Sequence, residues 1–243
     1  MKNENKGFSL IELSIVLIII GLLVAGITGG ASLIKSGQVR SIISEARNYK
    51  MAVNAYYASQ DKLPGDGYVD ASGSDDGDLD GHIEAIGANV AEGVAAWVDL
   101  EEQSIIDTGI AGADIAAKKV VVEALTHTTA SPCDLGSTTN TNMVASKSKG
   151  NYWTMDWDST MRNVLVITGQ TNGAQPTVTA AASDAQNQPI AGTTNIIKGL
   201  TALAIDTKMD DGIVSSGSVK TYGTSCTYAD NDQVCTLAIK IGI

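Results

Sequence analysis

The feature that most constrains this chain is an uninterrupted apolar run near its N-terminus. Residues 13–34 contain no Asp, Glu, Lys or Arg, and most of them are Leu, Ile, Val, Ala or Gly. A helix rises about 1.5 Å per residue, so this run is about 33 Å long, enough to cross the hydrocarbon core of a bilayer. It predicts a membrane-spanning helix, with Lys2 and Lys6 in a short cytoplasmic tail. The alternative is an ordinary secretory signal peptide, which would have a shorter apolar region and a small-residue cleavage site.

Glu12 lies immediately before this run, where a charged side chain is unexpected. A carboxylate at membrane depth costs a few kcal/mol or more, so such residues are rare and usually functional. The residues before it read Gly7-Phe8-Ser9-Leu10-Ile11 and include the only phenylalanine of the chain. A short basic leader thus ends in glycine, phenylalanine follows, and the glutamate is the fifth residue after that junction.

This pattern resembles the N-terminus of the type IV pilin and type II secretion pseudopilin superfamily. The resemblance implies cleavage between Gly7 and Phe8 by a prepilin peptidase, followed by N-methylation of Phe8. Cleavage creates an α-amine with a pKa of about 7.7–8.0, which is largely cationic at neutral pH. Leaving a buried charge unpaired costs about 3–5 kcal/mol, and pairing with this amine on a neighbouring subunit would spare Glu12 that cost. We therefore expect Glu12 to be an assembly residue.

The resemblance also implies partners and a location. Such subunits are held in the bacterial inner membrane by a single span, with the head outside the cytoplasm. An inner-membrane assembly platform then polymerises them with other copies or other pilins. The expected destination is an extracellular type IV pilus or a periplasmic secretion pseudopilus. The sequence leaves open which filament this is, whether the subunit is major or minor, and whether the filament serves adhesion, motility, DNA uptake or export.

The helical pattern continues beyond Lys35, where apolar and aromatic residues recur at spacings of three and four. They are Val39, Ile42, Ile43, Ala46, Tyr49, Val53, Tyr56 and Tyr57. The polar residues expected on the opposite, solvated face are Gln38, Arg40, Glu45, Arg47 and Lys50. The sequence predicts one helix over residues 8–59, the first half in lipid and the second half packed on a globular head.

The predicted fold class is α+β, with a leader at 1–7, the helix at 8–59 and a head domain at 60–243. In the superfamily that the N-terminus resembles, a small antiparallel sheet packs on the long helix, an arrangement likened to a ladle. Helical spacing predicts helices at Glu92–Ile105, with Trp97 in the core, and at Leu200–Asp211. The segments that read as strands are 119–124, 151–155, 163–168 and 236–241, and those that read as long loops are 128–149 and 170–194.

The chain is acidic, with a net charge of −11, which argues against nucleic acid as a partner. Within it, Asp76-Gly-Asp78-Leu-Asp80-Gly matches the first half of a calcium-binding loop, whose oxygen ligands alternate and whose glycine makes a sharp turn. His82 would contribute its backbone carbonyl. The twelfth position, normally glutamate, is Gly87, so Glu92, or less favourably Glu84, would complete the Ca²⁺ site. The alternative is an acidic loop that binds no cation.

The chain contains three cysteines. Cys226 and Cys235 lie close together in the sequence, and such a pair in an exported chain is expected to form a disulfide. Cys133 is distant from both and has no predicted partner.

We find no convincing set of catalytic residues in the sequence. Neither histidine lies in a nucleophile motif, and the paired acids Asp210-Asp211 are expected to point into solvent. The sequence therefore predicts a non-enzymatic protein, and the resemblance at the N-terminus implies a structural subunit that polymerises through its N-terminal helix. The alternative is a membrane-anchored extracellular calcium-binding or adhesive module that does not polymerise.

Overall fold

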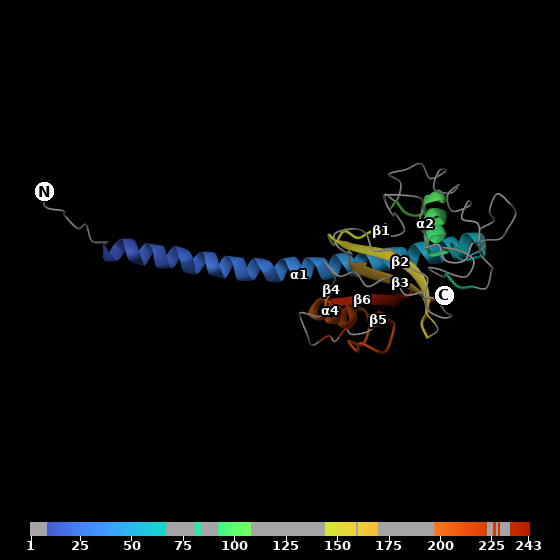
Figure 1. The fold of residues 1–243 in the computed structure, drawn as a ribbon. Coiled ribbons are helices and arrows are strands. Elements are labelled where there is room, and N and C mark those ends of the chain that lie inside the picture. Colours follow the sequence, from blue (N-terminus) through green and yellow to red (C-terminus); the bar gives the residue numbers. More distant parts are fainter. Residues whose placement is uncertain are drawn as a thin grey trace, which may run out of the picture. The chain divides into compact units, whose positions relative to one another are not determined.

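The computed structural model of the chain is shown in Figure 1. It describes residues 9–66, 81–83, 92–107, 144–158, 160–169, 197–222, 226, 228 and 234–243. The chain divides into two compact units, residues 1–40 and residues 41–243. The predicted strand at 119–124 and Cys133 lie outside the described residues.

Helix α1 (Leu10–Gln60) contributes its first part to the first unit and the rest to the second. It contains no proline, which agrees with its being continuous over 51 residues. The helix ends where Asp61 adopts a left-handed conformation (φ 57°), three residues before Pro64. This confirms the single long helix predicted from the sequence.

In the second unit, α1 buries the predicted apolar stripe. Ile42, Ala46, Val53 and Tyr56 are all buried, whereas Tyr57 is 42% exposed and does not belong to the stripe. The prediction for Glu45 was wrong: this side chain is not on the solvated face but only 4% exposed. Its burial is tolerated because three hydrogen-bond donors surround the carboxylate.

The second unit contains an antiparallel sheet in the order β1-β2-β3-β6-β4, with β5 also paired to β6 (Figure 1). β6 pairs with β3 along one edge and with β4 and β5 along the other. The strands are β1 (Val144–Ala145), β2 (Asn151–Asp158), β3 (Arg162–Gly169), β4 (Ile197–Lys198), β5 (Val219–Tyr222) and β6 (Val234–Lys240). The α+β class with a long helix and a small antiparallel sheet is therefore confirmed. β1, β4 and β5 are additional to the strands that the sequence predicted.

Two further helices complete the described part of this unit. Helix α2 (Glu92–Glu102) contacts β2, and helix α4 (Gly199–Met209) contacts β4, β5 and β6. Both agree with the helices predicted from residue spacing, and Trp97 is 1% exposed, as expected. Consecutive residues 164–167 of β3 are all fully buried, so both faces of this central strand are covered.

Candidate functional site

The N-terminal part of α1 exposes a continuous apolar surface. Every Leu, Ile and Val from Leu10 to Ile34 has at least 50% of its side-chain surface exposed. Among the described residues, α1 is the one helix that is long and apolar enough to cross a membrane, judged by length and composition. Exposed apolar surface of this extent marks a segment that lipid or protein covers.

Glu12 lies in the first turn of α1 and is itself exposed. Its Oε2 accepts a hydrogen bond of 2.9 Å from the backbone N–H of Ser9, whose hydroxyl accepts one of 3.3 Å from the N–H of Ile11. Ser9 and Glu12 thus form a capping box, which satisfies amides at the helix start that lack intrahelical partners. A negative charge in the first turn also interacts favourably with the helix dipole. The Ser-x-x-Glu spacing is a sequence signal for this cap that the sequence analysis did not use.

The proposed cleavage junction, Gly7 and Phe8, lies outside the described residues. The predicted contact between Glu12 and the amine of Phe8 would join two subunits, and this structure contains one chain. The assembly role of Glu12 therefore stays a prediction.

The predicted calcium ligands lie mostly outside the described part of the chain. Asp76, Asp78 and Asp80 are not among the described residues. The side chain of Glu92, at the start of α2, is not described either. His82 is described, and its ring lies 4.5 Å from that of Trp157, centroid to centroid. The ring therefore packs against an aromatic neighbour, and the role of the backbone carbonyl of His82 as a ligand stays a prediction.

The C-terminal end of this acidic segment is held firmly against the sheet. Gly81 has φ 84°, the left-handed conformation expected of the glycine in such a loop, and its N–H donates to Asp66 (3.0 Å). Asn163 of β3 accepts a bond from the N–H of Ile83 (2.8 Å) and donates to the carbonyl of Gly81 (3.0 Å). Ile83 is fully buried.

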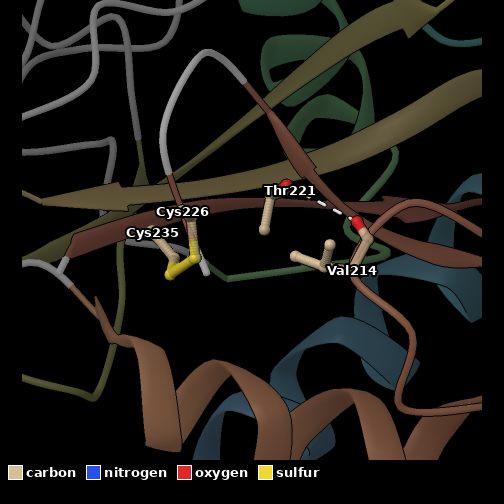
Figure 2. The surroundings of a disulfide bond; sticks show 4 residues. All are labelled: Val214, Thr221, Cys226 and Cys235. Atoms are coloured by element: carbon tan, nitrogen blue, oxygen red, sulfur yellow. Dashed lines mark hydrogen bonds between the residues drawn. A yellow bond between two sulfur atoms is a disulfide. The ribbon is translucent and has the colours of Figure 1, made fainter. Parts of the chain in front are cut away.

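The structure contains the predicted disulfide between Cys226 and Cys235, with the two Cα atoms 5.2 Å apart (Figure 2). Cys235 lies in β6 opposite Ile197 of β4, so the bridge ties the start of this strand to the segment that follows β5. Nearby, the Thr221 hydroxyl donates to the carbonyl of Val214 (3.5 Å), and the Thr221 N–H donates to the same carbonyl (3.2 Å).

A buried carboxylate that the sequence analysis missed anchors the head to α1. Glu45 accepts hydrogen bonds from the indole N–H of Trp153 (2.8 Å), the hydroxyl of Ser146 (2.6 Å) and the N–H of Lys147 (2.7 Å). The ring of Tyr49, one turn further along the helix, contacts both Trp153 and Trp97 edge to face, at 5.8 Å and 4.9 Å between centroids. Polar and aromatic contacts therefore join α1, α2 and β2.

The chain was compared with models of known protein families. Residues 2–28 match the model of the prokaryotic N-terminal methylation motif. This range includes the Gly7-Phe8 junction, Glu12 and residues 13–28 of the apolar run. No curated protein and no solved structure matches the chain.

Proposed function

Because the chain carries the N-terminal methylation motif that is the hallmark of type IV pilins and pseudopilins, we propose that it is the precursor of a filament subunit. A prepilin peptidase cuts after Gly7, Phe8 is N-methylated, and α1 holds the mature chain in the inner membrane until assembly. The subunit then polymerises through α1 into a type IV pilus or a secretion pseudopilus. The observation that carries the proposal is the match over residues 2–28, which covers the junction together with residues 13–28 of the apolar run.

Two features of the first unit support polymerisation through α1. Its apolar side chains are exposed all along residues 10–34, so the same surface that faces lipid before assembly is available to pack against other helices afterwards. Glu12 stands at the end of this surface, in the first turn of the helix and near the new N-terminus that cleavage would create. A cationic amine from a neighbouring subunit would neutralise it once the surrounding helices exclude water.

Processing is tested by the intact mass of the mature protein isolated from membranes. The expected chain begins at Phe8 and carries one additional methyl group on its amine. A mature chain that begins at another residue would contradict the proposed junction.

The assembly role of Glu12 must be separated from its role as a helix cap. Glu12→Gln keeps a side-chain oxygen that can accept the bond from Ser9 but removes the charge, whereas Ser9→Ala removes the hydroxyl of the cap and keeps the charge. We expect Glu12→Gln to insert into the membrane but to be absent from sheared filaments, and Ser9→Ala to assemble. Normal filaments from Glu12→Gln would contradict the assembly role of the Glu12 charge. A wild-type chain that inserts into the membrane but never enters filaments would favour the membrane-anchored module that does not polymerise.

We also propose that the acidic segment with Asp76, Asp78 and Asp80 binds Ca²⁺, with the carbonyl of His82 and the carboxylate of Glu92 as further ligands. The left-handed Gly81 and the anchored Ile83 support this, because they give the segment the turn and the core contact that such loops use. Thermal melts with Ca²⁺ and with a chelator test it. Calcium at millimolar concentration should raise the Tm of the wild type by an amount that decreases in Asp78→Ala, and an equal shift in both chains would contradict the assignment.

A further inference from the structure

Three carboxylates converge where α4 ends. Asp206 lies in the last turns of the helix, and Asp210 and Asp211 follow its last residue, Met209. One oxygen from each of the three side chains lies within 4.8 Å of the others. The sequence analysis expected Asp210 and Asp211 to point into solvent, but Asp210 is half-buried and faces the same group as Asp206.

Asp206 is the unusual member, because it is fully buried without a hydrogen-bond partner. Its side chain is 0% exposed, and neither of its carboxylate oxygens makes a hydrogen bond of normal geometry to a described residue. The hydroxyl of Tyr228 and the N–H of Gly212 are the donors that approach these oxygens. Burying a carboxylate without hydrogen-bond partners destabilises the fold unless a further partner is bound.

The other two carboxylates are already oriented by the loop that follows α4. Oδ2 of Asp210 accepts hydrogen bonds from the N–H groups of Ser218 and Val219, and Gly217 leaves the space for it, since a Cβ there would overlap the carboxylate. Asp211 accepts one bond from the N–H of Ile213 (2.8 Å) and one from the hydroxyl of Ser216 (2.7 Å). Oδ1 of Asp210 and a second lone pair on each oxygen of Asp211 can therefore still bind a cation.

The charges at this place have the same sign. Three carboxylates that converge within 4.8 Å repel one another, and the C-terminal end of α4 adds the negative end of a helix dipole. A bound divalent cation would relieve the repulsion and give the oxygens of Asp206 the partner that they lack. Oxygens on opposite sides of Ca²⁺, at 2.3–2.6 Å from the ion, are about 5 Å apart, and oxygens on adjacent sides are closer. The spread of the three carboxylates fits this geometry.

We propose that Asp206, Asp210 and Asp211 form a divalent-cation site of the calcium class, separate from the acidic segment that contains Asp76–Asp80. All three ligands are carboxylate oxygens, which suit Ca²⁺ and not the softer transition metals. The exposed Asp211 opens the site to solvent, and the buried Asp206 forms its floor. A cation here fixes the loop between α4 and β5 to the helix.

The experiment uses the full-length chain in detergent, with Asp78→Asn in every sample so that the acidic segment does not contribute. Calcium is titrated by calorimetry, and the Tm is recorded with Ca²⁺ and with a chelator. We expect the Asp78→Asn chain to bind one Ca²⁺ and to gain Tm on binding. Adding Asp211→Asn should weaken binding about tenfold or more, because the number of charged ligands sets calcium affinity.

Asp211→Asn is the main variant because it is exposed and its amide can still accept from Ile213 and donate to Ser216, so the fold should be kept. Asp206→Asn is the second variant, and it should abolish binding while raising the Tm in the presence of chelator, since it removes the repulsion. The proposal is overturned if Asp78→Asn binds no Ca²⁺ at millimolar concentration. It is equally overturned if the chain with both substitutions binds as tightly as Asp78→Asn alone.

Discussion

The indole Nε1 of Trp153 donates a hydrogen bond of 2.8 Å to Oε2 of Glu45, which joins residues 108 positions apart in the sequence. The same oxygen accepts from the Ser146 hydroxyl, and Oε1 accepts from the N–H of Lys147. One carboxylate on α1 therefore satisfies donors from β2 and from the turn between β1 and β2. The second half of α1 is held to the sheet by this polar contact as well as by its apolar stripe.

We predict that Glu45→Ala destabilises the second unit by about 3–5 kcal/mol. The substitution leaves the indole N–H of the fully buried Trp153 without its acceptor, and each buried polar group left unsatisfied costs about 1–3 kcal/mol. The free energy of unfolding is measured by urea titration of the full-length chain in detergent, with tryptophan fluorescence as the signal.

Arg47→Ala is the matched control, because Arg47 lies on the same helix and is exposed. It should change the free energy of unfolding by no more than about 0.5 kcal/mol. Glu45→Gln should fall between the two, since its amide oxygen can accept only part of the three bonds. If Glu45→Ala is as stable as Arg47→Ala, the carboxylate does not anchor the sheet.

The position of Glu45 shows where the sequence analysis reached its limit. Glu45 lies three residues after Ile42 and four before Tyr49, so helical geometry alone places it inside the apolar stripe. A charged residue was nevertheless assigned to the solvated face, because burial of a carboxylate requires partners. Those partners are Ser146, Lys147 and Trp153, and no local pattern connects them to Glu45.

The helices and strands could likewise be predicted only where the local sequence defines them without distant partners. Elements such as α1, β2, β3 and β6 were predicted, because each contains enough apolar residues in its own segment to identify it as a helix or a strand. The two-residue strands β1 and β4 were not predicted, since each is defined only by its pairing partner: Val144 by Trp153, and Ile197 by Cys235.

The cluster of three carboxylates at the end of α4 was missed for a related reason. Asp210 and Asp211 were considered as neighbours in sequence, while Asp206, four residues earlier and therefore on the same helical face as Asp210, was not.

We predict opposite effects for two substitutions of Asp99 in α2. Oδ2 of Asp99 accepts from the Tyr56 hydroxyl (3.0 Å) and from the N–H of Gly65 (2.9 Å), which ties α2 to the end of α1. Burial raises the pKa of Asp99, although the bonds from Gly65 and Tyr56 and the charge of Lys62 oppose it. A carboxyl whose pKa is raised on folding stabilises the fold below its unfolded pKa, and this contribution is lost as the pH rises through the folded pKa.

At pH 7, therefore, Asp99→Asn should be at least as stable as the wild type, because it removes the charge and keeps an acceptor for both bonds. Asp99→Ala should lose about 2 kcal/mol, since it leaves two donors without acceptors. Urea unfolding at pH 7 and at lower pH measures both. As the pH falls through the raised pKa, the wild type should gain stability relative to Asp99→Asn. A wild type that loses stability relative to Asp99→Asn over this range would show that the bonds outweigh the burial.

The disulfide gives a third prediction. Cys226 and Cys235 are nine residues apart, and closing a loop of this size restricts the unfolded chain by about 2–3 kcal/mol. Cys226→Ser should reduce the free energy of unfolding by that amount, whereas Cys133→Ser should leave the bridge intact. Peptide mapping without reduction should recover the two segments as one linked peptide. Recovery of Cys133 linked to either cysteine would contradict the pairing.

The last prediction concerns the turn between β2 and β3, where Asp158 acts as an acceptor for the chain that follows it. Its Oδ1 accepts from the N–H (2.8 Å) and the hydroxyl (2.6 Å) of Thr160 and from the N–H of Met161 (2.8 Å). Partial burial raises the pKa of this carboxyl, but the bonds from Thr160 and Met161 together with the charge of Lys220 outweigh burial and lower it.

A carboxyl whose pKa is lowered on folding contributes stability that is fully present above its unfolded pKa, about 3.9, and is lost as the pH falls through the folded value. Asp158→Ala should therefore be less stable than the wild type by about 1–2 kcal/mol at pH 7, and the difference should shrink as the pH is lowered below about 4. Lys220→Met tests the contribution of the neighbouring charge, since Nζ of Lys220 lies 3.2 Å from the Thr160 hydroxyl. That variant should lose less than Asp158→Ala, because the three hydrogen bonds to Asp158 remain. A difference between wild type and Asp158→Ala that stays constant from pH 7 to pH 3 would mean that the turn is held by contacts other than the ionised carboxylate.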